Sequence, residues 1–92
     1  MAAWRLERLR MRREVLQLRM DRAMVERHLA EAEAHVVRGG DLIARQQGLI
    51  AELAWDGHDT AEAKRLLTTL EATQALLLAH RDLVRRELAD LS

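Results

Sequence analysis

The fold of this 92-residue chain is decided by residues 55–62, which read Trp-Asp-Gly-His-Asp-Thr-Ala-Glu. Gly57 is free to adopt the left-handed backbone conformation that commonly ends a helix. Asp59, followed three residues later by Glu62, has the spacing of a capping box, which starts a helix. The stretch therefore predicts a tight turn at residues 56–59 between two helices.

Apolar and small residues recur at alternating spacings of three and four on both sides of this turn, which is the repeat of coiled-coil helices. Before the turn the repeat consists of Trp4, Arg8, Met11, Val15, Leu18, Arg22, Val25, Leu29, Ala32, Val36, Gly39, Ile43, Gln46, Ile50 and Leu53. After the turn it consists of Ala63, Leu66, Leu70, Thr73, Leu77, His80, Val84, Glu87 and Leu91. We therefore expect one helix over residues 4–56 and a second over residues 60–90.

The pair Gly39-Gly40 interrupts the first of these segments. Two consecutive glycines cost about 2 kcal/mol of helix propensity, so a break at residues 39–40, with Asp41 capping a third helix, is an alternative. The repeat nevertheless stays in register across the two glycines, which favours one continuous helix.

Folding the second helix back on the first predicts an all-α fold, a long antiparallel, coiled-coil-like helical hairpin that forms a single domain over residues 1–92. This pairing places Gly39 opposite Leu77 and Gln46 opposite Leu70. Small residues then repeatedly face large ones, which allows two helix axes to approach closely.

The first helix is longer than the second by roughly 30 Å at 1.5 Å per residue. In this overhang the apolar residues form two rows on opposite sides of the helix. The first apolar row is Trp4, Met11, Val15, Leu18 and Val25, and the second apolar row is Leu6, Leu9, Leu16, Met20 and Met24. Between them lie Arg5, Arg8, Arg12 and Arg19 on one flank and Glu7, Glu14 and Asp21 on the other. A helix that is apolar on two sides needs two neighbours, so we expect both rows to form the interface of a dimeric helical bundle.

The charges balance, with 15 basic and 15 acidic residues, but residues 1–40 hold nine arginines against six acids. This asymmetry suits association of the chain with itself at least as well as binding of a polyanion. The chain has no cysteine, which excludes disulfides and thiolate chemistry and suits the cytoplasm. No apolar stretch is long enough for a signal peptide or a membrane span, so we expect no membrane partner.

The sequence contains no catalytic signature. Its glycines fit no phosphate-binding loop, and its only serine is Ser92, so we expect neither an enzyme nor a cofactor. His35, His80 and Glu31 are candidate ligands of a metal, or a candidate pH sensor, because the hairpin brings His80 towards His35. They lack a recognised ligand spacing, so we expect polar positions that set the helix register rather than a metal site.

These features favour a small helical module for protein–protein interaction and regulation that acts as a homo-oligomer and docks another protein. A nucleic-acid-binding protein that uses the arginine-rich first helix is an alternative, although Glu7, Glu14 and Asp21 interrupt its basic surface. A pH or metal sensor that uses the histidines is a further alternative.

A resemblance covers residues 28–90. It rests on the Gly-His-Asp-Thr turn at residues 57–60 and on His35, Val36, Gly39, Ile43, Ala44, Arg45, Gln46, Leu49, Ile50, Ala63, Leu66, Leu67, Glu71, His80, Arg81 and Leu88. In these residues the chain resembles a group of short bacterial helical proteins of unassigned function. The resemblance implies a helical hairpin and a bacterial origin, and it implies no activity, cofactor or catalytic residue.

Overall fold

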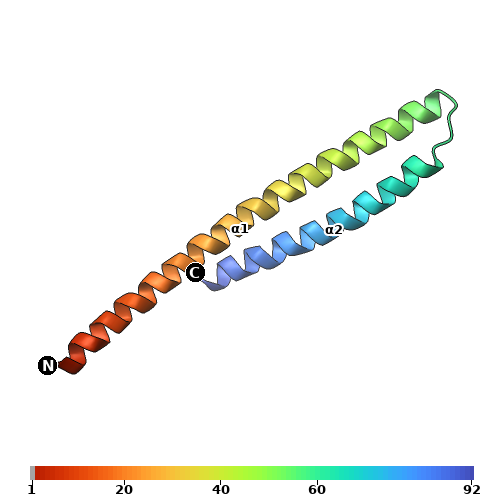
Figure 1. Ribbon diagram of the computed structural model, residues 1–92. Helices are drawn as coiled ribbons and strands as arrows, with labels where there is room; N and C mark the ends of the chain where they lie inside the picture. Colours follow the sequence, from red (N-terminus) through yellow and green to blue (C-terminus); the bar gives the residue numbers. More distant parts are fainter. Residues whose placement is uncertain (1) are drawn as a thin grey trace.

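The computed structural model describes residues 2–92, which form two helices, α1 (Ala2–Trp55) and α2 (Ala61–Asp90), and no strand. The helices lie side by side and antiparallel, in a rod of 85 × 16 × 14 Å (Figure 1). The predicted all-α antiparallel hairpin is confirmed. α1 begins two residues earlier than expected, and α2 begins one residue later.

Gly57 ends α1 in the way the turn sequence predicts. Its φ of 77° lies in the left-handed region that favours glycine. The His58 amide donates a hydrogen bond to the Leu53 carbonyl (2.8 Å), and the Gly57 amide donates to Ala54 (3.2 Å). This pair of hydrogen bonds is a Schellman motif, which satisfies carbonyl groups that the end of a helix leaves unpaired.

Asp59 contributes to the start of α2 through a hydrogen bond to the amide two residues later, not through the predicted capping box. Its Oδ1 accepts a hydrogen bond from the Ala61 amide (2.9 Å), while the Thr60 carbonyl accepts the first helical bond, from Lys64. Thr60 is therefore the capping residue. Within residues 2–92 neither hydrogen bond of the predicted capping box forms, because Asp59 Oδ1 accepts from the Ala61 amide rather than from the Glu62 amide, and Glu62 makes no return hydrogen bond to Asp59.

α1 runs through Gly39 and Gly40 without interruption, so the described chain has two helices rather than three. Its contacts with α2 follow the predicted repeat. The residues of α1 that are buried or half-buried from residue 25 onwards are Val25, Leu29, Ala32, Val36, Gly39, Ile43, Gln46, Ile50 and Leu53. The 3.5-residue repeat therefore identifies the α1 positions that face α2 from Val25 to Leu53, whereas before Val25 it selects the exposed Arg22 in place of the half-buried Asp21.

The prediction for α2 is wrong at every second position. Four predicted positions face α1 as expected: Ala63, Leu70, Leu77 and Val84. The residues that alternate with them in the repeat lie one position later than predicted. They are Leu67, Gln74, Arg81 and Leu88 in place of Leu66, Thr73, His80 and Glu87. The last predicted position, Leu91, lies beyond the end of α2 and is exposed. The structure selects the set that buries Leu88 and exposes Glu87, because burying an unpaired carboxylate is costly.

The position opposite Gly39 is also corrected, because Gly39 packs against Gln74 rather than Leu77. A Cβ atom on Gly39 would overlap Gln74 Oε1 and lie 2.9 Å from Gln74 Cδ. The missing side chain lets Gln74 Nε2 donate a hydrogen bond to the Val36 carbonyl (2.8 Å). Gln46 likewise donates to the Ala63 carbonyl (2.9 Å) instead of facing Leu70. Two glutamines thus connect the helices through backbone carbonyl groups.

Candidate interaction surface

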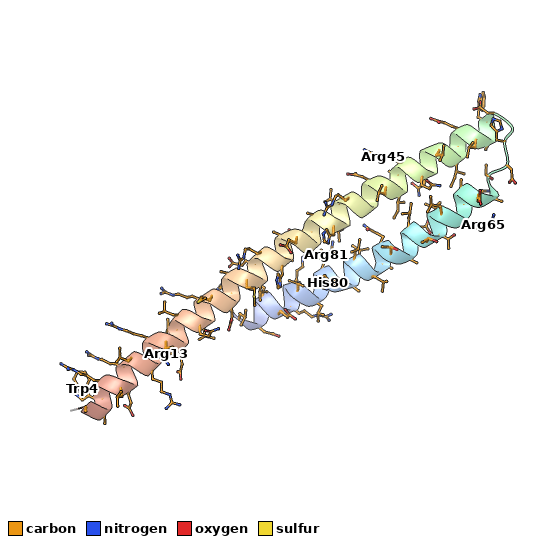
Figure 2. The ribbon with its side chains drawn as sticks, in the orientation of Figure 1. Trp4, Arg13, Arg45, Arg65, His80 and Arg81 are labelled. Atoms are coloured by element: carbon orange, nitrogen blue, oxygen red, sulfur yellow. The ribbon has the colours of Figure 1, made fainter. Side chains whose placement is uncertain are left out.

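The N-terminal part of α1 extends beyond the end of α2, as Figure 1 shows. Trp4 and Arg13 lie on this extension, whereas His80 and Arg81 lie where the two helices run together (Figure 2). Every described residue up to Met20 is exposed, and Asp21 is the first half-buried one. We call residues 2–20 the overhang.

The overhang and Met24, which follows it on α1, display large apolar side chains that nothing within residues 2–92 buries. Nine of the ten residues predicted to form an oligomer interface keep between 43% and 66% of their surface exposed. They are Trp4, Leu6, Leu9, Met11, Val15, Leu16, Leu18, Met20 and Met24. An apolar surface of this kind marks an interaction site on a protein in water.

Val25, the tenth residue predicted for that interface, is a correction. It is only 8% exposed, because it belongs to the set of α1 residues that face α2. The structure therefore ends the uncovered part of the first apolar row before Val25.

The hairpin itself has little core. Among the apolar residues of the described chain, only Val25, Ala32 and Val84 are buried. Two helices cover each other on one side only, so a hairpin shields less apolar surface than a bundle of three or four helices. The paired part of the hairpin therefore also exposes apolar side chains, although fewer than the overhang does for its length.

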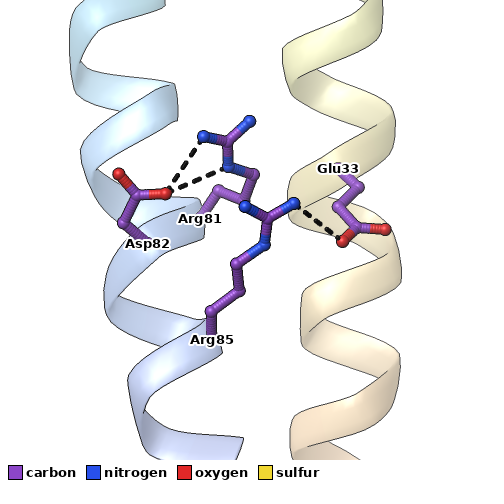
Figure 3. A network of polar contacts seen from close by, with 4 residues as sticks. All are labelled: Glu33, Arg81, Asp82 and Arg85. Atoms are coloured by element: carbon purple, nitrogen blue, oxygen red, sulfur yellow. Dashed lines mark hydrogen bonds and ion pairs between the residues drawn. The ribbon is translucent and has the colours of Figure 1, made fainter.

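The two flanks of the paired helices differ in chemistry. On one flank Arg85 Nη2 lies 3.5 Å from Glu33 Oε1, and Arg81 donates to Asp82 Oδ1 from Nε (3.2 Å) and Nη2 (3.0 Å) (Figure 3). The ions of the Glu33–Arg85 pair are half-exposed, so the pair contributes little to stability but shows that this flank is polar.

The opposite flank carries exposed leucines. A shallow groove between the helices has Leu42, His35 and Thr73 along its edges. Leu49 lies one heptad after Leu42, and Leu66 lies one heptad before Thr73, so both belong to the same flank. Leu42, Leu49 and Leu66 are 50%, 44% and 49% exposed. We call these three leucines the apolar flank.

Charged residues form two separate rows along the overhang, one of which ends at Asp21, the residue that follows it. The arginine row is Arg5, Arg12 and Arg19, and the acidic row is Glu7, Glu14 and Asp21. Glu14 Oε1 lies 3.6 Å from Arg10 Nε, and Asp21 accepts a hydrogen bond from Gln17 (3.3 Å). Within residues 2–92 no ion pair involves the arginine row.

Trp4 and Arg8 form a contact at the tip of the overhang. The guanidinium carbon of Arg8 lies 4.5 Å from the centre of the Trp4 ring, which is a cation–π geometry. Both residues belong to the repeat that faces α2 further along α1. At an exposed site such a contact contributes about 0.5–1 kcal/mol.

The candidate metal ligands do not converge. His35, His80 and Glu31 are all exposed, and the described residues contain no group of three histidine, aspartate or glutamate side chains placed to hold a metal ion. The reason is the corrected α2 register: Arg81, not His80, faces α1, so His80 points outwards. In the part of the chain that the structure covers, no helix combines the length and apolar character needed to cross a membrane.

Comparison with protein-family models, with curated proteins and with solved structures found no match for this chain. The helical hairpin that the resemblance implies is present in the structure. The resemblance itself and the bacterial origin that it implies remain predictions.

Proposed function

We propose that this chain is a small helical module for protein–protein interaction and regulation, and that it acts as a homo-oligomer through the overhang. The observation that carries the proposal is the exposure of nine large apolar residues on and next to the overhang. Burying one such side chain fully contributes about 1.5–3 kcal/mol. A second copy of the chain brings an identical surface, so each copy can cover the other.

The two apolar rows divide the task between two neighbours. The first apolar row continues the α1 positions that face α2, so it is suited to another helix packed in the same coiled-coil manner. The second apolar row lies on the other side of α1 and remains open when the first is covered. We assign the first row to a second copy and the second row to a protein partner. A chain without cysteine suits the cytoplasm, where we place this interaction.

Light scattering coupled to size exclusion tests the proposal on the full chain. The wild type is expected to elute as a dimer or larger assembly at tens of micromolar, and Leu18→Glu is expected to shift it to a monomer. Val37→Glu is the matched control, because Val37 is 63% exposed but lies on the hairpin body away from the overhang. A wild-type monomer, or equal loss of association in both variants, contradicts the proposal.

A further inference from the structure

We infer that two copies associate in the same direction, about a twofold axis parallel to the helices, so that their overhangs form a parallel two-stranded coiled coil. The inference rests on the proposed self-association and adds its orientation. Two observations carry it independently: the order of charges along the overhang, and the difference between the two flanks of the hairpin.

The heptad positions of the overhang follow from the contacts that α1 makes with α2. The spacings of four and three between Val25, Leu29 and Ala32 place Val25 and Ala32 at position d and Leu29 at position a. Continuing the same spacing towards the N-terminus puts Trp4, Met11 and Leu18 at d, and Arg8 and Val15 at a. Each member of the arginine row then follows a d residue and occupies position e. Each member of the acidic row precedes an a residue and occupies position g.

This order of charges distinguishes the two possible directions of pairing. In a parallel pair, position g of one helix faces position e of the next heptad on the other, so Glu7 meets Arg12 and Glu14 meets Arg19 of the second copy. In an antiparallel pair, e faces e and g faces g, which sets arginine against arginine and acid against acid. Opposite charges attract and like charges repel, so the charges at positions e and g favour the parallel pair, against one like-charge contact between the two Arg8 side chains at position a.

The arginine row has no acidic partner within its own helix. Residues three or four positions apart are the neighbours on a helix surface. For Arg12 these are Arg8, Leu9, Val15 and Leu16, and neither Arg5 nor Arg19 has an acid at such a distance. A second copy in parallel orientation supplies the acids that these arginines lack.

The hairpin body accepts the same arrangement. With both copies pointing the same way, the four helices form a bundle in which each α1 lies diagonally across from the other α1 and contacts two α2 helices. On the polar flank each α1 contacts the α2 of its own copy, where Glu33 pairs with Arg85. On the apolar flank it contacts the α2 of the other copy. The bundle therefore covers Leu42, Leu49 and Leu66. Beyond the end of α2 only the two overhangs continue, as a two-helix coiled coil.

Disulfide cross-linking tests the direction of pairing. The chain contains no cysteine, so single substitutions report unambiguously. In the parallel pair each d residue faces its own counterpart, so Trp4→Cys alone and Leu18→Cys alone are each expected to form disulfide-linked dimers in a glutathione redox buffer. In an antiparallel pair position d of one helix faces position a of the other, so Trp4 faces Val15, and only a mixture of Trp4→Cys with Val15→Cys cross-links. Val37→Cys, on the outer surface, is the control and should remain unlinked.

The outcomes separate this inference from the proposal on which it rests. Cross-linking only in the mixture overturns the parallel direction and leaves self-association intact. Dimers by light scattering that cross-link at neither position overturn the coiled coil through the first apolar row. Monomers by light scattering at tens of micromolar, for the wild type and both variants, overturn the inference and the proposed function together.

Discussion

Replacing Gly39 by alanine tests the contact between α1 and α2 at the position where the Gln74 side chain fills the space of a Cβ atom. Alanine in a helix interior is more favourable than glycine by about 0.5–1 kcal/mol. At Gly39 the added Cβ overlaps Gln74 Oε1, so the Gln74 side chain must swing away and lose its hydrogen bond to the Val36 carbonyl. A hydrogen bond of this kind contributes about 0.5–1.5 kcal/mol.

The two effects have opposite signs, so Gly39→Ala is expected to leave the free energy of unfolding unchanged or lower it slightly. Gly48→Ala is the matched control, since a Cβ there meets no atom within 4 Å. It should show the full gain of about 0.5–1 kcal/mol. In a Gln74→Ala background the obstruction is gone, so Gly39→Ala should also show that gain. The expected coupling between positions 39 and 74 is about 1 kcal/mol.

Urea denaturation followed by circular dichroism measures these differences. All variants should carry Leu18→Glu, because self-association would otherwise add to the apparent stability. If Gly39→Ala stabilises the hairpin as much as Gly48→Ala, and substitution of Gln74 does not change its effect, then Gln74 does not pack against Gly39 and the corrected register is wrong.

Three further predictions follow from the turn, the charge rows and the histidines. Gly57→Ala should destabilise the hairpin by about 1–2 kcal/mol in thermal melts, because alanine is strained at a φ of 77°; a gain like that of Gly48→Ala would refute the Schellman turn. Raising NaCl from about 50 to 500 mM should increase the dimer dissociation constant, because salt screens attraction between exposed opposite charges; a decrease would indicate like charges facing each other. Zinc should leave the melting temperature of the wild type and of His80→Ala unchanged; a zinc-dependent rise that His80→Ala abolishes would show that the histidines converge.

The contacts of α1 were predictable residue by residue, because between Val25 and Leu53 only one set of positions with the 3.5-residue spacing is mainly apolar. α2 offers two sets of positions that look alike, since Leu66 stands next to Leu67, and Thr73 and Gln74, like His80 and Arg81, are both polar. The difference between Glu87 and Leu88 at the end of the helix is the sequence feature that distinguishes the two sets.

Other features depend on how the two helices meet, which the repeat alone does not specify. Val25 and Leu18 are both apolar and occupy the same position in the repeat. Val25 is covered and Leu18 is not, because α2 ends between them. The contact between Gly39 and Gln74 likewise requires the relative shift of the helices. The apolar rows of the overhang were predictable because they depend on α1 alone.

Small-angle X-ray scattering of the full-length wild type tests the central claim most directly, because it reports mass and length together. The account predicts a particle of twice the 10.6 kDa chain mass with a maximum dimension close to the 85 Å of a single hairpin, since two copies that point the same way add width but little length. Antiparallel pairing of the overhangs would join two hairpins end to end and give roughly 145 Å, from two 85 Å rods that overlap over about 15 residues. A dimension near that value, or the mass of one chain, would contradict the account.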